Sequence, residues 1–236
     1  MIKLLFVCHG NICRSPMAEF IFKDMLVRAG KSDGFLVQSA ATSSEELGNP
    51  VYPPARRKLS ELGISCEGKT ARRVSAREYG DWDMFIGMDR ENLYNLRRLF
   101  SGDPDGKVKN LADFCGKAGY EIDDPWYTGD FDTACRDITE GCLGLMQSLT
   151  DGEVTLDFGD CGSRAELWSV VSDRMLLGRG CGRNLDALWD TVSGHLPYYG
   201  RSFRVVLPAE PEIRDYAGRI ADTLSDAGLE CVVEDS

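Results

Sequence analysis

The residues with the clearest capacity for chemistry lie near the amino terminus, in the segment Cys8-His-Gly-Asn-Ile-Cys-Arg-Ser15. The apolar run over residues 2–7 predicts a buried strand before it, and Pro16 directly after it is typical of a first helical turn. The segment between them is then a strand-to-helix loop, whose free N–H groups and helix dipole favour a bound anion. The same field would hold Cys8 as a thiolate. The sequence therefore predicts a nucleophilic cysteine inside an anion-binding loop.

The spacing Cys-x5-Arg is weak evidence without its context, because the chain has nine cysteines and a second copy of the spacing from Cys66 to Arg72. That copy has Arg73 where a hydroxyl is needed, and no proline-led helix follows it directly. The copy at Cys8 has the predicted strand before it, and Ser15 and the predicted helix after it. We therefore expect the chemistry at Cys8.

The elements that must position this loop follow from the apolar pattern of the first 150 positions. Four short apolar runs predict strands, at 2–7, 35–38, 84–88 and 108–111. Four longer segments predict helices, at 16–30, 53–62, 90–100 and 131–149, the third with Asp89 as its N-cap. This alternation implies an α/β fold, a parallel twisted sheet with helices on both faces. Ligands bind such sheets at the carboxyl ends of the strands, where the Cys8 loop lies.

The composition changes at the turn signal Thr150-Asp-Gly152, which indicates a domain boundary. Residues 153–236 contain no lysine and carry 15 acidic residues against 8 arginines, a net charge of −7, while the first 152 residues carry the other −4. A second set of strands is predicted at 154–158, 203–207 and 230–233. Helices are predicted between them, one opened by a capping box at Ser163 and the others at 185–193 and 213–227. We expect two domains, residues 1–152 and residues 153–236, the second a small α/β domain.

The overall charge and the cysteine pattern argue against several kinds of protein. A formal net charge of −11 disfavours non-specific binding to nucleic acid or to an anionic membrane. The cysteines form no CxxC pairs, so we expect reduced thiols, with neither a disulfide framework nor a zinc site. No run approaches the roughly 18 apolar residues that span a bilayer, and no signal-peptide pattern is present. We expect a soluble cytoplasmic protein.

Residues 1 to about 150 resemble the low-molecular-weight protein tyrosine phosphatases. The pieces that carry the resemblance occur in the family's order: Cys8-His-Gly-Asn-Ile-Cys-Arg-Ser15, Ser39-Ala-Ala-Thr42, Gly48-Asn-Pro50, Met88-Asp89 and Asp124-Pro-Trp-Tyr127. The resemblance implies that the substrate is a phosphotyrosine-containing protein or a small phosphoester, and that hydrolysis proceeds through a phosphocysteine intermediate. It implies no metal and no other cofactor, since the loop itself supplies the positive field.

The resemblance also assigns roles to residues. Cys8 is expected to be the nucleophile, Arg14 to bind two phosphate oxygens with its planar fork, and Asp124 to act first as general acid and then as general base. The neighbouring Asp123 is the competing carboxylate for that last role. Ser15 is expected to stabilise Cys8 as a leaving group. The other residues expected to bind phosphate or to support the loop are His9, Gly10, Asn11, Ile12, Cys13 and Ser39.

Several assignments in this domain have an alternative. Trp126 and Tyr127 either wall a slot for an aromatic ring or pack in the core. Cys13 either forms a reversible disulfide with Cys8 or is a small apolar filler. Glu45 stands where many members of the family have an aromatic or apolar wall residue, which leaves the peptide preference open. In addition, a lysine, Lys69, stands where a histidine often pairs with the position of Asp89, so that contact is expected to be missing or replaced.

Three other functions of the same fold are alternatives to a tyrosine phosphatase. Related arginine phosphatases carry threonine at the position of Ile12, so Ile12 favours phosphotyrosine. Arsenate reductases of similar fold use extra cysteines near the third strand, and residues 84–91 contain none. The third alternative is a protein that binds phosphorylated ligands without catalysis.

The run Arg183-Asn-Leu-Asp-Ala-Leu-Trp-Asp190 is the most distinctive feature of the last 84 residues, and this region resembles the ribonuclease inhibitor barstar. Proteins of that family have a small α/β domain with a three-stranded parallel sheet, and an acidic helix of this domain blocks the basic cleft of a ribonuclease. The resemblance implies that Asp186, Trp189 and Asp190 bind a basic, ribonuclease-like protein, since Asp186 and Asp190 share a helix face. The alternative is a solvated acidic helix with Trp189 in the core.

Overall fold

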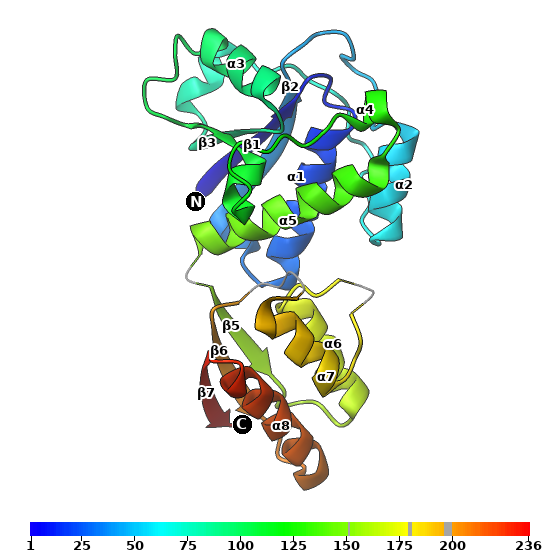
Figure 1. The fold of residues 1–236 in the computed structure, drawn as a ribbon, viewed down its shortest axis with the longest axis vertical. Coiled ribbons are helices and arrows are strands. Elements are labelled where there is room, and N and C mark those ends of the chain that lie inside the picture. Colours follow the sequence, from blue (N-terminus) through cyan, green and yellow to red (C-terminus); the bar gives the residue numbers. More distant parts are fainter. Residues whose placement is uncertain (151, 179–180, 196–199) are drawn as a thin grey trace. The chain divides into compact units, whose positions relative to one another are not determined.

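Strand β1 (Ile2–Cys8) lies inside a four-stranded parallel sheet of the computed structural model, in the order β2–β1–β3–β4 (Figure 1). The other three strands are β2 (Phe35–Ala41), β3 (Met84–Gly87) and β4 (Val108–Asn110). The last five residues of β1 are buried, as expected of an inner strand covered on both faces. The structure describes residues 1–150, 152–178, 181–195 and 200–236.

Helices cover both faces of this sheet, as predicted. On one face Phe22 of α1 (Arg14–Arg28) packs against Phe6 of β1, with 5.8 Å between the ring centroids, and α5 (Phe131–Leu149) lies alongside α1. On the other face Leu93 and Leu96 of α3 (Arg90–Leu99) join a cluster with Leu5 and Val7, the alternate residues of β1. The remaining helices of the first 150 residues are α2 (Pro53–Glu61), α4 (Pro125–Thr128) and the 3₁₀ turns Ser32–Gly34, Ala76–Gly80 and Leu111–Cys115.

Two element boundaries near the Cys8 loop differ from the prediction, and both matter for the site. Helix α1 begins at Arg14, so Pro16 is its third residue; proline is tolerated there because the N–H groups of a first turn lack helical partners. Strand β2 continues to Ala41, three residues beyond the predicted end, so Ser39 lies within the strand. The predicted N-cap of α3 is confirmed, since Asp89 Oδ1 accepts the N–H of Asn92 at 2.7 Å.

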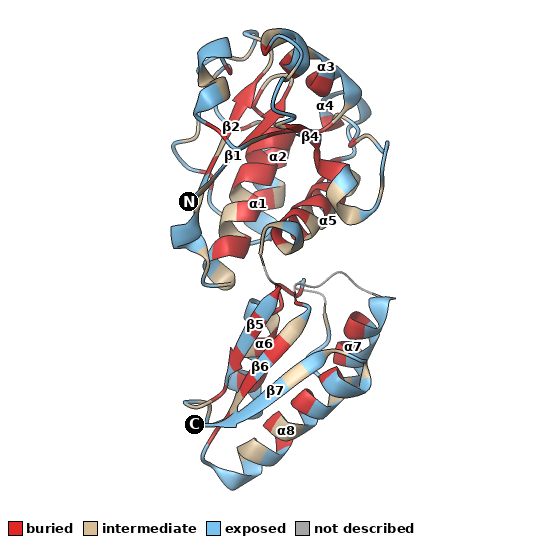
Figure 2. Ribbon diagram, turned by 90° about the vertical axis from the view of Figure 1, so that its left-hand side faces the viewer, coloured by how far each residue is buried: buried red, intermediate tan, exposed pale blue. Residues whose placement is uncertain are grey.

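The second part of the chain has its own parallel sheet, in the order β5–β6–β7, with strands β5 (Glu153–Asp157), β6 (Ser202–Leu207) and β7 (Glu230–Asp235). Buried and exposed residues alternate along β5, where Val154 and Leu156 are buried, so one face is packed and the other is open (Figure 2). The helices are α6 (Arg164–Arg174), α7 (Leu185–Asp190) and α8 (Pro211–Asp226). This small α/β arrangement is the predicted one.

Two details of the second part correct the prediction. The predicted helix over 185–193 ends as an α-helix at Asp190 and continues as a π-helical turn, Thr191–His195, in which Gly194 has a φ of 92°. The capping box is only half formed: Ser163 accepts the N–H of Glu166, but the Glu166 carboxylate accepts the N–H of Gly162.

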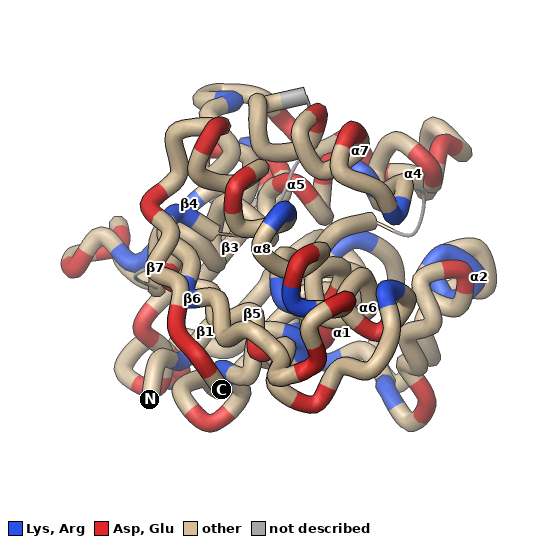
Figure 3. The backbone as a smooth tube through the Cα atoms, turned by 90° about the horizontal axis from the view of Figure 1, so that it is seen from below, with Lys and Arg blue, Asp and Glu red and all other residues tan. Residues whose placement is uncertain are grey.

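The chain divides into two compact units, Met1–Leu145 and Met146–Ser236. The predicted turn at 150–152 includes Asp151, which is outside the described residues. Acidic residues occur along the backbone of both units (Figure 3). Among the described residues, no helix combines the length and the apolar character that a membrane span needs.

Candidate active site

The loop between β1 and α1 is held in shape by Asn11, whose backbone has a positive φ of 58° and whose side chain is fully buried. Its Nδ2 donates to Ser15 Oγ at 2.9 Å and to Ser39 Oγ at 2.8 Å, and its Oδ1 accepts the N–H of Arg72 at 3.1 Å. Asparagine tolerates this left-handed conformation better than most residues do. One buried amide thus ties the loop to α1, to β2 and to the segment between α2 and β3.

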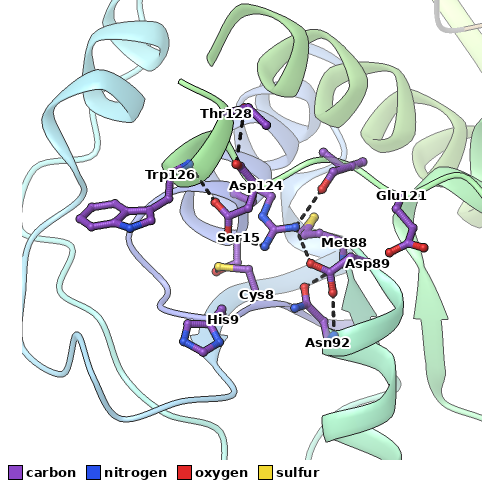
Figure 4. Close-up of polar contacts among 12 residues, drawn as sticks. Cys8, His9, Ser15, Met88, Asp89, Asn92, Glu121, Asp124, Trp126 and Thr128 are labelled. Atoms are coloured by element: carbon purple, nitrogen blue, oxygen red, sulfur yellow. Dashed lines mark hydrogen bonds and ion pairs between the residues drawn. The ribbon is translucent and has the colours of Figure 1, made fainter. Parts of the chain in front are cut away.

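Cys8 lies at the carboxyl end of β1 and is nearly buried, with 3% of its surface exposed. Its Sγ is 3.0 Å from Ser15 Oγ and accepts the N–H of Asn11 at 3.3 Å. Both contacts suit a sulfur atom that carries negative charge. Figure 4 shows Cys8 between Ser15, His9 and Asp124.

Arg14 is the largest fully buried side chain among the residues that the structure describes, and its guanidinium group is held by acceptors from two distant segments. Nη1 donates to Asp89 Oδ2 at 2.6 Å and to the carbonyl of Ile122 at 2.8 Å, and Nη2 donates to Asp124 Oδ2 at 2.5 Å. Burial alone would lower the pKa of Arg14, but Cys8, Asp124 and Asp89 together raise it above its ordinary value. The remaining donor, Nε, is buried without a partner.

Asp124 lies over the loop because Pro125 begins α4 directly after it. Asp124 caps this short helix, its Oδ1 accepting the N–H of Trp126 at 3.1 Å while its Oδ2 faces Arg14. Asp124 lines the same cavity as Cys8, whereas Asp123 lines only a neighbouring cavity. Of the two adjacent carboxylates, Asp124 is therefore the one placed beside the cysteine.

The cavity above the loop has a volume of about 150 Å³. Its lining contains most of the residues predicted from the sequence: Cys8, His9, Gly10, Ile12, Cys13, Asp124, Trp126 and Tyr127, with Glu45 and Glu46 added. Trp126 and Tyr127 are 50% and 80% exposed, and Trp126 packs against Tyr52 in a tilted arrangement with the ring centroids 4.9 Å apart. Both aromatic residues therefore line the cavity, and neither packs in the core.

Cys13 also lines this cavity and is buried. Burial raises the pKa of its thiol well above the ordinary value, and the negative charges of Cys8 and Asp124 raise it further. All nine cysteines of the chain are free thiols in this structure, Cys13 among them.

The lysine that replaces the family's usual histidine does not approach Asp89. Lys69 Nζ lies 2.9 Å from Glu19 Oε2 and donates to the carbonyl of Ser39 at 3.1 Å, while Asp89 pairs with Arg14. The expected contact is thus replaced by an ion pair with Glu19, which is 4% exposed and also accepts the Ser39 hydroxyl at 2.6 Å. Glu19 was not among the residues predicted from the sequence. Its spacing of four residues before Lys23 on a helix was the local signal that could have indicated an ion pair there.

The three acidic and aromatic residues predicted to bind a partner all lie on α7 and are exposed. Trp189 is 44% exposed, so it does not pack in the core; Leu188 is the buried residue of this helix. Asn184 caps the helix, its Oδ1 accepting the N–H of Ala187 at 2.9 Å. Asp186 and Asp190 are thus carried on a well-started helix at a spacing of one turn.

Comparison with known proteins matches two families to successive parts of the chain. Residues 3–154 match the family model of the low molecular weight phosphotyrosine protein phosphatases, and residues 152–233 match that of barstar, the barnase inhibitor. The low molecular weight protein-tyrosine-phosphatase YfkJ of Bacillus subtilis is 39% identical over 150 residues, which are 63% of this chain and 96% of the relative.

Solved structures agree with this comparison. The crystal structure of Bacillus subtilis YfkJ aligns with a TM-score of 0.61 at 39% identity, covering 63% of this chain and 94% of the other. A Drosophila arginine phosphatase aligns with a TM-score of 0.58 at 31% identity, covering 63% and 98%. The fold of the first unit is therefore shared by phosphatases described with different substrates.

Proposed function

The chain belongs to the low molecular weight phosphotyrosine protein phosphatase family, since the family model covers well over half of it (residues 3–154), and we propose that it hydrolyses phosphotyrosine with Cys8 as the nucleophile. The observation that carries the proposal is the Nε–H of Arg14, a buried donor without an acceptor. Buried donors are almost always paired, so this one calls for an acceptor from outside the chain. An oxygen of a bound phosphate group supplies it.

In the first step the Cys8 thiolate attacks phosphorus, the bond from phosphorus to the tyrosyl oxygen breaks, and Asp124 gives its proton to that oxygen. Arg14 and the loop N–H groups neutralise the charge on the three equatorial oxygens. Because Asp124 Oδ2 contacts Arg14 Nη2 in the structure, the incoming phosphate takes over this donor and frees the carboxyl group for proton transfer.

In the second step Asp124 takes a proton from water, whose oxygen attacks the phosphocysteine. The bond from sulfur to phosphorus breaks, inorganic phosphate leaves, and the Cys8 thiolate is restored. The Ser15 hydroxyl donates a hydrogen bond to the departing sulfur; its Oγ lies 3.0 Å from Cys8 Sγ in the structure. Asn11 and Ser39 keep Ser15 and the loop in place.

The walls of the cavity support an aromatic substrate. Ile12 is nearly buried, and Trp126 and Tyr127 present exposed rings at the cavity's edge. A phosphotyrosine ring can stack there, whereas the threonine expected of an arginine phosphatase is absent. The two activities are distinguished by the rates of hydrolysis of a phosphotyrosine peptide and a phosphoarginine peptide that are otherwise identical in sequence. The Ile12→Thr variant should show a smaller preference for the phosphotyrosine peptide.

The enzymatic proposal is tested with p-nitrophenyl phosphate and with vanadate as a phosphate analogue. The wild type should hydrolyse the ester, Cys8→Ser should abolish turnover, and Cys66→Ser, at the other Cys-x5-Arg copy, should retain it. Asp124→Asn should lower turnover at least a hundredfold, because proton transfer contributes about 10²–10⁴ to such reactions. A wild type that binds vanadate without hydrolysing the ester would make the protein a phosphate-binding module.

For the second unit we propose a binding function for a basic, ribonuclease-like protein. The supporting observations are the barstar match over residues 152–233 and the exposure of Asp186, Trp189 and Asp190 on α7. Mixing the full chain with a basic bacterial ribonuclease at low salt should give a complex and inhibit the nuclease. The double variant Asp186→Ala, Asp190→Ala should weaken binding at least tenfold, and Asp160→Asn, an exposed acid after β5, should not.

We further propose that the domains are residues 1–152 and 153–236, and that the protein works in the cytoplasm, where Cys8 and the other eight thiols stay reduced. Limited proteolysis should cut first near residue 152. Cleavage inside α5 before the junction would contradict this boundary.

A further inference from the structure

The entrance to the Cys8 cavity is walled by carboxylates that the proposed reaction does not use. Glu45 and Glu46 line one side. Glu45 is exposed and lies 2.9 Å from His9 Nε2. Glu46 is held against the loop. Its carboxylate accepts Asn49 Nδ2 at 2.7 Å, and a Cβ atom added at Gly10 would lie 3.1 Å from the Cγ of Glu46.

A second cavity, of about 260 Å³, adjoins the first and shares His9, Asp124 and Tyr127 with it. Its lining adds the carboxylate of Asp89, which pairs with Arg14, and three others, those of Glu91, Glu121 and Asp123. Figure 4 shows Glu121 beyond Asp89, on the side away from Trp126. The mouth of the proposed active site is therefore acidic on both sides.

Few positive charges balance these walls. Arg14 is buried and already faces Asp89 and Asp124. Arg90 pairs with Glu121, a residue of the second cavity's lining, at 3.0 Å and is 79% exposed. Among the described residues no cluster of histidine, cysteine and carboxylate groups is close enough to hold a metal ion. The walls thus suit separate cationic side chains better than a single bound cation.

This arrangement poses an electrostatic problem for a phosphate dianion that approaches Arg14, because these five carboxylates line the two adjoining cavities. A substrate that carries lysine or arginine beside the phosphorylated residue relieves the repulsion and gains ion pairs with the walls. We infer that this enzyme selects phosphotyrosine flanked by basic residues, an inference that rests on the proposed phosphotyrosine phosphatase activity. Glu45 and Glu46 on one side, and Glu91, Glu121 and Asp123 on the other, determine the selectivity.

The size of the effect follows from the number of pairs. An exposed ion pair changes affinity by about two- to fivefold, so two or three pairs give roughly a tenfold preference. Because such pairs are screened, the preference should shrink at 0.5 M salt.

The test compares kcat/KM for three phosphotyrosine peptides that differ only in their flanking residues, which are lysine, glutamine or glutamate. The wild type should favour the lysine peptide over the glutamine peptide about tenfold and reject the glutamate peptide. The double variants Glu45→Gln, Glu46→Gln and Glu121→Gln, Asp123→Asn should each reduce the lysine preference severalfold. Glutamine at position 46 can still accept from Asn49, so the wall keeps its shape.

Two controls separate this inference from the proposed activity. Hydrolysis of p-nitrophenyl phosphate, which has no flanking residues, should not fall in either double variant, because the removed carboxylates only repel its dianion. Glu67→Gln removes one carboxylate at a separate cavity and should leave kcat/KM for all three peptides unaffected. Equal kcat/KM for the three peptides, or a lysine preference that survives in both double variants, would overturn the inference while leaving the phosphatase intact. A wild-type protein that hydrolyses neither p-nitrophenyl phosphate nor any of the three peptides would overturn the proposed activity instead.

Discussion

Ser15 Oγ lies 3.0 Å from Cys8 Sγ and accepts Asn11 Nδ2 at 2.9 Å, so its own hydrogen is free to point to the sulfur or to the carbonyl of Ala40, 3.3 Å away. Helix α1 begins one residue earlier, at Arg14, which brings the hydroxyl and the guanidinium group to the same end of β1. The nucleophile and its stabilising donor are thus neighbours because only five residues, 9–13, join β1 to α1.

Ser15→Ala removes this donor and should slow breakdown of the phosphocysteine more than its formation. A hydrogen bond to a charged group is worth about 1.5–3 kcal/mol, so turnover should fall roughly 10- to 100-fold. Rapid-mixing kinetics with p-nitrophenyl phosphate should then show a burst of about one equivalent of nitrophenol. Ser60→Ala, on the exposed side of α2, is the control, and a Ser15→Ala enzyme with wild-type turnover would contradict this role for the hydroxyl.

Asp89→Asn tests how Arg14 is positioned. Asparagine caps a helix as well as aspartate does, so α3 keeps its N-cap while the ion pair with Arg14, now 2.6 Å long, is lost. We expect kcat to fall about tenfold, because Nη1 retains only the carbonyl of Ile122.

The inhibition constant of inorganic phosphate is the second readout for Asp89→Asn. It should change less than threefold, since removal of a negative charge offsets the looser positioning. Asp89→Ala, which also loses the cap, should cost a further ~1 kcal/mol of unfolding free energy. An Asp89→Asn enzyme with unchanged kcat would show that the Ile122 carbonyl suffices.

Glu19 makes stability depend on pH on the acid side. Burial opposes its ionisation, but Lys69, Lys23 and the Ser39 hydroxyl outweigh burial and hold the pKa of Glu19 below its ordinary value of 4.5. A carboxyl group with a lowered pKa in the folded state contributes stability that is present above its ordinary pKa and is lost as pH falls through the folded-state value.

The measurement is the free energy of unfolding by urea between pH 7 and pH 3. Glu19→Gln should lower it by about 1–3 kcal/mol at pH 7, because Lys69 loses its carboxylate partner, and should flatten its fall below pH 4.5. Glu67→Gln, an exposed residue, should leave the curve unchanged. An identical acid-side slope in Glu19→Gln and the wild type would assign that slope to other carboxyl groups.

The sequence predicts the site where its signal is local. A strand, a cysteine loop and a proline-led helix are contiguous, so Cys8, Arg14 and Ser15 could be placed before any fold was known. The ion pair of Glu19 with Lys69 could not, because its members are 50 positions apart and meet only where the segment between α2 and β3 packs beside β2 and α1. The same is true of Glu46, whose place beside Gly10 depends on the loop after β2 folding back over the site.

Two glycines in helix interiors should respond in opposite directions to alanine. Alanine in place of glycine normally stabilises a helix by about 0.5–1 kcal/mol. At Gly218 in α8 a Cβ meets nothing within 4 Å, so Gly218→Ala should give this gain. At Gly144 in α5 a Cβ would lie 2.2 Å from the carbonyl oxygen of Phe114, a backbone atom that cannot rotate away.

Gly144→Ala must therefore push α5 away from the turn at Leu111–Cys115, which should cost about 1–3 kcal/mol despite the better helix former. Urea unfolding followed by circular dichroism measures both variants. Gly144 belongs to the first compact unit and Gly218 to the second, so where the units unfold separately, each variant should move only its own transition. If Gly144→Ala proved as stabilising as Gly218→Ala, the close approach of α5 to Phe114 would be wrong.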